Sequence, residues 1–188
     1  MVSDKILQIL ILGDDTMSNV NVLVTEYELA QRCRDLGQEI SNDYKGKTLH
    51  IVCVLTGAVF FACELSKNIS IPVVFDCISA SSYGHGTTSS GNVSVLDDLK
   101  NDIKGKDVLI VEDIVDTGNT IKKLKEVLAS KKPRSIKVCT MLDKPERREV
   151  NEKADYVAFQ MPNKFVVGYG LDNTDGTCRN LPYIGYIE

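Results

Sequence analysis

The stretch V-L-I-V-E-D-I-V-D-T-G-N-T, residues 108–120, decides the fold. Its first four residues are apolar and predict a short strand buried on both faces, which is typical of a parallel sheet. Glu112 and Asp113 follow at the carboxyl end of that strand, and Asp116 comes three residues after Asp113. In doubly wound sheets ligands bind beyond the carboxyl ends of the strands, so we expect a ligand site at these acids.

The turn Thr117-Gly118-Asn119-Thr120 supplies the second half of the pattern. Its backbone N–H groups and its two threonine hydroxyls can surround an anion at the N-terminus of a helix predicted over residues 121–130. Gly118 lets the backbone approach a ligand closely. Simple capping of that helix by Thr120 would explain a lone D-x-x-T-G, but it does not explain two adjacent acids at the end of a buried strand. The pattern therefore favours a site for phosphate and ribose.

Predicted helices and strands alternate along the rest of the chain. A helix begins at Thr25, where Glu28 completes a capping box. Further strands are expected at residues 48–55, 71–79, 135–142, 156–160 and 165–169, further helices at 58–66 and 121–130, and an irregular tail at 172–188. This order predicts an α/β fold with a doubly wound, mainly parallel sheet flanked by helices.

The length of 188 residues and the apolar content of 43% suit one domain. We expect a core over about residues 25–165 and a small hood from residues 1–24 and 165–188. Residues 79–93 are rich in glycine and hydroxyl side chains that bury little, and they predict a mobile lid. The apolar run 6–12 is too short to span a bilayer, so we expect a strand or helix that packs on the body.

Charge and cysteine content exclude several classes of protein. The formal net charge of -4 gives no general attraction to nucleic acid or to anionic lipid. The six cysteines form no C-x-x-C pair and no zinc-binding spacing with the two histidines. We therefore expect reduced thiols and a cytoplasmic protein that binds neither nucleic acid nor membrane.

Six blocks of sequence carry a resemblance to a known family. They are V-L-T-G at 54–57, S-S-Y-G at 81–84, E-D-I-V-D-T-G-N-T at 112–120, L-D-K-P-E-R-R at 142–148, F-V-V-G-Y-G-L-D at 165–172 and R-N-L-P-Y-I-G at 179–185. With these blocks, the chain resembles the hypoxanthine and hypoxanthine-guanine phosphoribosyltransferases over nearly its whole length. The resemblance implies the type I phosphoribosyltransferase fold and a homodimer or homotetramer.

The activity implied by the resemblance belongs to purine salvage. A magnesium-dependent enzyme transfers 5-phosphoribose from 5-phosphoribosyl 1-pyrophosphate to a 6-oxopurine, hypoxanthine or guanine, and gives IMP or GMP and pyrophosphate. Glu112 and Asp113 would bind the ribose hydroxyls and, directly or through water, Mg²⁺. Residues 117–120 would bind the 5-phosphate, and Asp116 would be the general base at purine N7.

The resemblance also assigns the purine and pyrophosphate contacts. Lys144 would donate to the 6-oxo group, Phe165 would stack on the purine, and the Val166 backbone would meet its edge. Backbone N–H groups of Thr56 and Gly57, after a cis peptide at Leu55-Thr56, would bind pyrophosphate. The remaining assignments are Arg179 at pyrophosphate, Asp172 at a second Mg²⁺, and Ser82 and Tyr83 at the working end of the lid.

Two departures from the family pattern and three alternatives accompany this interpretation. Position 56 is threonine where many relatives carry lysine or arginine, and the segment 173–178 is one residue longer than usual. An RNA-binding regulator that keeps the ribose-phosphate loop would need a basic surface. A dinucleotide-binding oxidoreductase would need a complete G-x-G-x-x-G, which the glycine-rich segments lack. A preference for xanthine or guanine depends on main-chain geometry near Val166 and Asp172 and stays open.

Overall fold

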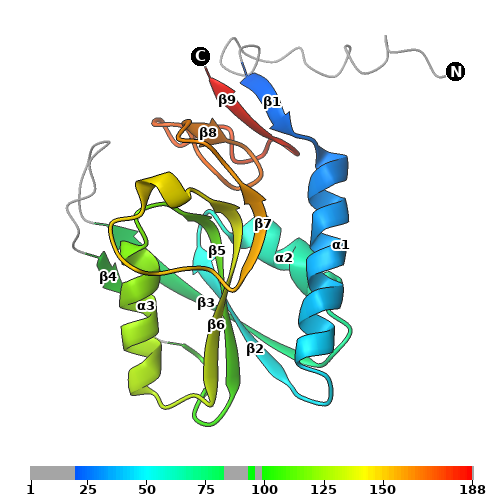
Figure 1. Cartoon of the computed structure of the whole chain (residues 1–188), viewed down its shortest axis with the longest axis vertical. Helices are drawn as coiled ribbons and strands as arrows, with labels where there is room; N and C mark the ends of the chain where they lie inside the picture. Colours follow the sequence, from blue (N-terminus) through cyan, green and yellow to red (C-terminus); the bar gives the residue numbers. More distant parts are fainter. Residues whose placement is uncertain (1–19, 83–92, 96–98, 188) are drawn as a thin grey trace, which may run out of the picture.

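The computed structural model describes residues 20–82, 93–95 and 99–187 (Figure 1). For residues 81–82 and 93–95 only the backbone is described. The apolar run 6–12 and most of the expected lid, residues 83–92, lie outside the described residues.

A six-stranded sheet forms the centre of the protein. Its order is β4-β3-β2-β5-β6-β7, and all neighbours are parallel except β4, which runs antiparallel to β3. The strands are β2 (Leu49–Leu55), β3 (Val73–Ser82), β4 (Val93–Val95), β5 (Asp107–Val115), β6 (Ser135–Asp143) and β7 (Tyr156–Gln160). The predicted mainly parallel sheet is confirmed, and its parallel strands bring their carboxyl ends to one edge.

Helices cover both faces of this sheet (Figure 1). The helices α1 (Glu26–Asp43) and α2 (Val59–Lys67) pack on one face, and α3 (Asn119–Ser130) packs on the other. The predicted capping box starts α1, because the Glu28 N–H donates to Thr25 Oγ1 at 3.3 Å and the Thr25 N–H donates to Glu28 Oε2 at 2.8 Å. The doubly wound arrangement is therefore confirmed as well.

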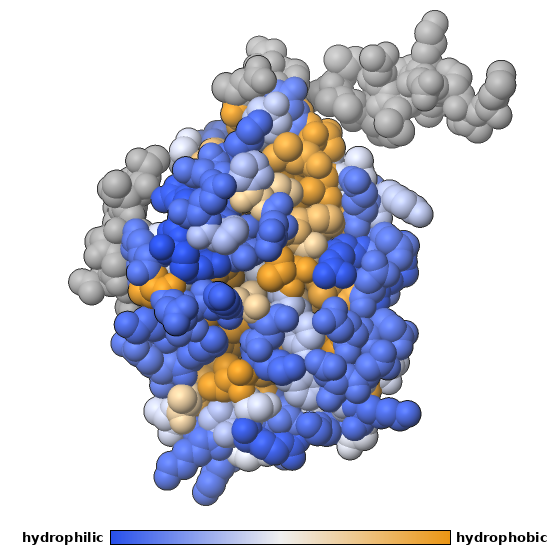
Figure 2. Space-filling model, in the orientation of Figure 1, coloured by the Kyte–Doolittle hydropathy of each residue, from blue (hydrophilic) through white to orange (hydrophobic). Residues whose placement is uncertain are grey.

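A second, three-stranded antiparallel sheet forms the hood. Its order is β1-β9-β8, with β1 at Val20–Val24, β9 at Ile184–Ile187 and β8 at Val166–Val167. Ile184 and Val166 join the same buried cluster as Leu29 of α1. Figure 2 shows hydrophobic residues gathered where the beginning of α1 meets this small sheet, on a face that is otherwise largely hydrophilic. The hood is thus fixed to the core by apolar packing.

Several boundaries differ from the sequence predictions. The tail is not irregular throughout, because residues 184–187 pair with β1 across the length of the chain. Residues 80–82, expected in the lid, continue β3 because they pair with β4. The strand expected at residues 165–169 stops at Val167, because Gly168 and Tyr169 both have positive φ, at 96° and 50°, and leave the extended conformation.

The central strand β5 is longer than the four apolar residues predicted, and it continues through Glu112 and Asp113 to Val115. All six cysteines are free thiols. Among the described residues, no helix combines the length and the apolar character that a membrane crossing requires.

Candidate active site

Two neighbouring carboxylates on β5, the buried Glu112 and the half-buried Asp113, have few hydrogen-bond partners. Glu112 is 6% exposed, and its Oε2 has no hydrogen-bond partner in the described part of the chain. The Asp113 N–H donates to Glu112 Oε1 at 3.3 Å, and the Ile114 N–H donates to Asp113 Oδ1 at 2.6 Å. Burial, followed by the charge of Asp113, raises the pKa of Glu112 well above its ordinary value, and burial raises the pKa of Asp113 as well. A cation or hydroxyl donors would stabilise this pair in its charged form.

The turn of residues 117–120 connects β5 to α3 and has a fixed shape. Gly118 is the N-cap of α3 and has a φ of 88°, a backbone conformation that residues with a Cβ rarely adopt. The backbone N–H groups of Glu149 and Val150 donate to Thr117 O at 3.0 and 3.4 Å. The Asn119 N–H donates to Thr117 Oγ1 at 3.3 Å. The segment after β6 therefore supports the predicted phosphate loop, whose last member, Thr120, stands in the first turn of α3.

The predicted purine contacts lie after β5 (Asp116), after β6 (Lys144) and at the start of β8 (Phe165 and Val166). Arg147 Nε is 2.8 Å from Asp116 Oδ1, an ion pair that lacks hydrogen-bond geometry. The buried Lys144 donates from Nζ to Lys164 O at 2.6 Å. Burial lowers the pKa of Lys144, while the nearby charge of Asp116 opposes that shift.

Phe165 follows Lys164 directly, and its side chain is 52% exposed. Val166 begins β8 and is buried. An exposed aromatic residue that directly follows the partner of a buried ammonium suits the binding of a flat heterocycle with polar edges.

The loop after β2 touches the carboxylate pair. The peptide Leu55-Thr56 is cis, as expected. A Cβ placed on Gly57 would lie 1.6 Å from Asp113 Oδ2, and one placed on Gly170 would lie 2.1 Å from Gly57 O. Only glycine allows these approaches, so the segments that carry Gly57, Asp113 and Gly170 converge at one place.

Arg179 and Asp172 lie beside this point. Arg179 donates from Nη1 to Gly170 O at 2.6 Å and from Nη2 to Asp172 Oδ2 at 2.5 Å. The charge of Arg179 also partly opposes the effect of burial on the pKa of Asp113. The lengthened segment 173–178 forms its own turn, in which the Asn173 N–H donates to Thr177 O at 2.9 Å. Arg179 and Asp172, both predicted site residues, therefore form an ion pair close to Asp113.

The structure thus brings together the predicted residues of the β2, β5 and β6 ends and of the segment 165–179. Tyr83 and the side chain of Ser82 lie outside the described residues. Arg147 and Arg148 were missed, although both stand in the L-D-K-P-E-R-R block. Their partners lie up to 33 residues away in the chain, so no local pattern gave them a role.

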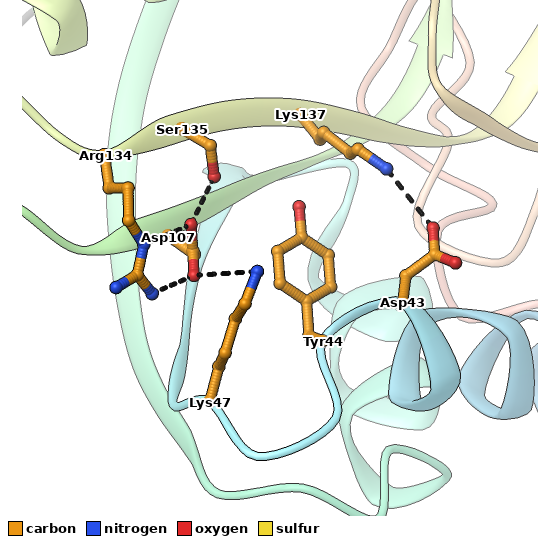
Figure 3. Close-up of a pocket in the computed structure, with 7 residues that line it drawn as sticks. All are labelled: Asp43, Tyr44, Lys47, Asp107, Arg134, Ser135 and Lys137. Carbon is orange, nitrogen blue, oxygen red and sulfur yellow. Dashed lines mark hydrogen bonds and ion pairs between the residues drawn. The ribbon is translucent and has the colours of Figure 1, made fainter.

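A pocket of about 320 Å³ lies at the opposite end of the sheet (Figure 3). It is lined by Asp43, Tyr44, Lys47, Asp107, Arg134, Ser135 and Lys137. Arg134 binds the Asp107 carboxylate with two nitrogens, and Lys137 Nζ lies 3.2 Å from Asp43 Oδ2. Because these charges are paired within the chain, the pocket is not our candidate site.

Comparisons with known proteins agree with this geometry. The family model of the phosphoribosyl transferase domain matches residues 22–174. The chain is 44% identical over 178 residues to the bifunctional protein TilS/HprT of Listeria monocytogenes, a match that covers 94% of this chain and 27% of that protein. The chain thus spans about a quarter of that relative's length.

Two further relatives match along most of their own length. The hypoxanthine-guanine phosphoribosyltransferase of Streptococcus thermophilus is 44% identical over 167 residues, which cover 89% of this chain and 92% of that protein. The crystal structure of a hypoxanthine phosphoribosyltransferase from Staphylococcus aureus is similar with a TM-score of 0.88 and 42% identity, and the match covers 94% and 96% of the two chains. The chain therefore belongs to the phosphoribosyl transferase domain family.

Proposed function

We propose that the chain transfers 5-phosphoribose from 5-phosphoribosyl 1-pyrophosphate to hypoxanthine and guanine, which gives IMP or GMP and pyrophosphate. One observation carries the proposal. A carboxylate pair, with Glu112 buried and Asp113 half-buried, and a hydroxyl-rich turn both lie at the end of β5. The Lys144 ammonium and the Asp116 carboxylate are close enough to interact there, and the exposed Phe165 follows the residue whose carbonyl accepts from Lys144. The carboxylate pair and the turn suit a sugar phosphate. The ammonium, the Asp116 carboxylate and the aromatic ring suit an oxopurine. The names of the Streptococcus and Staphylococcus relatives support this acceptor.

The donor half of the site must stabilise charge separation. When the bond between C1 and its oxygen breaks, positive charge develops on the sugar and negative charge on pyrophosphate. In the proposal, Glu112 and Asp113 accept hydrogen bonds from the ribose hydroxyls and hold negative charge near the sugar. The backbone and hydroxyls of residues 117–120 bind the 5-phosphate at the N-terminus of α3.

The acceptor half must bind a flat base and remove one proton. Asp116 takes the proton from purine N7 as N9 bonds to the sugar, which is general base catalysis by a positioned carboxylate. Lys144 donates to the 6-oxo group, and this contact favours oxopurines over adenine because an ammonium has no acceptor for an amino group. Phe165 stacks on the ring, and the Val166 backbone meets its edge.

The residues present fit a magnesium ion. Glu112 Oε2 is a buried carboxylate oxygen with no hydrogen-bond partner in the described residues, next to the half-buried carboxylate of Asp113. No group of three metal-binding side chains occurs among the described residues, so substrate oxygens and water would complete the coordination, as Mg²⁺ prefers. Glu112 and Asp113 would hold one ion and Asp172 a second. When bound, magnesium would supply positive charge at the leaving pyrophosphate.

Pyrophosphate would lie against the loop after β2. The N–H groups of Thr56 and Gly57 would donate to it, and Arg179 would contact it with the guanidinium that now pairs with Asp172. Release of Asp172 from Arg179 would free that carboxylate for the second ion. Ser82 and Tyr83 would belong to a lid that excludes water from the activated sugar.

The test is pyrophosphate release by the purified chain with 5-phosphoribosyl 1-pyrophosphate and each of hypoxanthine, guanine, xanthine and adenine. We expect release with hypoxanthine and guanine, no release with adenine, and loss of activity in EDTA that excess Mg²⁺ restores. Equal release with adenine would contradict the role of Lys144. An absence of release with every base would overturn the proposed function.

We also propose that the chain forms a homodimer or homotetramer and works in the cytoplasm. Val73 and Phe75 are exposed on β3, and in the described residues this part of β3 pairs on one side only, with β2. An open strand edge with exposed apolar side chains is a surface that a second copy of the chain would cover. Six free thiols fit a reducing compartment. Light scattering of the purified chain tests the assembly.

A further inference from the structure

Arg148 is a largely covered arginine to which the proposed reaction gives no role. Its side chain is only 15% exposed. From Nη1 it donates to Val115 O at 3.0 Å and to Asp116 O at 2.6 Å, and from Nη2 it donates to Asp143 Oδ1. One guanidinium therefore binds three acceptors that belong to the ends of two different strands, β5 and β6.

These two strand ends carry the two polar groups that the proposed reaction sets against the purine. Asp116 follows β5, and Lys144 follows β6. The Lys144 N–H donates to Val115 O at 3.0 Å, so a single carbonyl accepts from both Lys144 and Arg148. The guanidinium thus closes a ring of contacts between the backbone at Asp116 and the backbone at Lys144.

The arrangement depends on the shape of arginine. The parallel ladder between β5 and β6 ends at the pair Val115 and Asp143, so the Asp116 carbonyl has no strand partner and needs another donor. A planar guanidinium holds its donors in a fixed fork and can serve two carbonyls and a carboxylate at once. A lysine ammonium is a compact point charge that would keep the ion pair with Asp143 but could not hold all three acceptors in the same geometry.

We infer that Arg148 is a positioning residue for the acceptor half of the reaction. It fixes the spacing between the Asp116 carboxylate, which takes the N7 proton, and the Lys144 ammonium, which binds the 6-oxo group. This inference rests on the proposed function. The phosphate loop keeps its support in an Arg148→Lys variant, because Thr117 O accepts from the backbone N–H groups of Glu149 and Val150 and because lysine retains the Cδ that lies beside Gly118. Loss of Arg148 should therefore impair use of the purine far more than binding of the donor.

The experiment is steady-state kinetics of Arg148→Lys in the full chain, with hypoxanthine and the phosphoribosyl donor varied separately. We expect kcat/KM for hypoxanthine to fall about 100-fold, the size of effect that a shift of about 1 Å at reacting groups produces. The KM for the donor should change by less than about 3-fold, because its contacts remain. In Arg148→Ala, added ethylguanidine should restore part of the turnover.

Arg134→Lys is the matched control. Arg134 also binds a buried aspartate across β5 and β6, but at the opposite end of the sheet. If both arginines only stabilise the fold, each variant will lose thermal stability. Each will keep the wild-type kinetic constants for hypoxanthine and for the phosphoribosyl donor. We expect this from Arg134→Lys alone. The inference would be overturned if both variants showed the same fall in kcat/KM for hypoxanthine with a nearly constant KM for the donor. An unchanged kcat/KM for hypoxanthine in Arg148→Lys would overturn it as well.

Failure of the inference is distinguishable from failure of the proposed function. An active wild type beside an equally active Arg148→Lys overturns only the positioning role, whereas a wild type without turnover overturns both. If Arg148→Lys does not fold, Asp143→Asn replaces it, because asparagine leaves an acceptor for the guanidinium. In this variant kcat/KM for hypoxanthine should also fall, but by less, while the KM for the donor stays nearly constant. An equal loss in the use of both substrates would count against the inference.

Discussion

The two ends of β5 carry acids of similar burial in opposite electrostatic settings. At its start, Asp107 is 2% exposed, accepts from Arg134 with both oxygens, accepts from Ser135 Oγ at 2.6 Å, and has Lys47 Nζ at 3.8 Å (Figure 3). Towards its end, Glu112 is almost as deeply buried, yet one carboxylate oxygen has no partner among the described residues.

The pKa values move in opposite directions for this reason. Hydrogen bonding to Arg134 lowers the pKa of Asp107 to about 2, whereas burial raises the pKa of Glu112 well above its ordinary value. Depth of burial is therefore not what separates a structural acid from a functional one. The difference lies in whether the chain itself supplies the partners, and an acid left without them is a candidate for binding a ligand.

The largest effect should come from the functional end of the strand. In Asp116→Asn we expect turnover to fall by about 10² to 10⁴-fold, because asparagine cannot accept the N7 proton. Affinity for the phosphoribosyl donor should stay unchanged, since its proposed contacts lie elsewhere. Single-turnover kinetics together with a donor-binding titration measure the two quantities, and undiminished turnover would remove Asp116 from the role of general base.

Asparagine and glutamine substitutions at the two ends should have opposite effects on stability. Asp107→Asn should lower the free energy of unfolding by about 1 to 3 kcal/mol, because it weakens a buried network, and should leave activity intact. Glu112→Gln should raise the free energy of unfolding by about 0.5 to 2 kcal/mol while activity falls, as expected where a site is stabilised at the expense of function. Urea titration at pH 8 compares them, and a loss of stability in Glu112→Gln would contradict the contrast.

The same contrast predicts a pH dependence with opposite signs. The raised pKa of Glu112 means that its contribution to stability is fully present below pH 4.5 and is lost as the pH rises through its folded-state pKa. The contribution of Asp107 is present above pH 3.8 and is lost as the pH falls towards 2. Relative to Glu112→Gln, the wild type should therefore lose stability above pH 4.5, by at most about 1.4 kcal/mol per pH unit. A difference that stays constant with pH would contradict the assignment.

The smallest effect is expected at the rim of the pocket in Figure 3. Lys47 is 44% exposed and lies 3.8 Å from an aspartate that Arg134 already binds. Lys47→Met should change the free energy of unfolding by less than about 0.5 kcal/mol and leave turnover unaltered. Reduced turnover in this variant would mean that the pocket end of the sheet also serves the reaction.

Local sequence patterns predicted the parts of the molecule that local interactions build. The capping box at Thr25 and Glu28 starts α1 where expected, because both partners lie within one helical turn. The strand and turn of residues 108–120 were likewise predictable, because a run of apolar residues followed by Gly118 restricts the backbone. The same patterns placed the acids at the carboxyl edge of a parallel sheet.

Contacts between distant segments could not be predicted from single patterns. The strand β9 forms only because β1, at the other end of the described chain, supplies its partner. Residues 80–82 continue β3 because β4 returns beside them. The ion pair of Arg147 with Asp116 and the contacts of Arg148 join segments about 30 residues apart. A motif can name such arginines, but only the fold reveals what they bind.

The pairing of β1 with β9 has a consequence for how the chain can be cut and joined. Val20 and Ile187 are cross-strand partners, so the two ends of the described chain meet. A short linker could connect them, with new termini opened at Gly46, an exposed turn residue where an added Cβ would meet no atom of the described residues within 4 Å. Such a circular permutant would preserve every strand pairing of the hood, so the order of segments along the gene is separable from the architecture that they build.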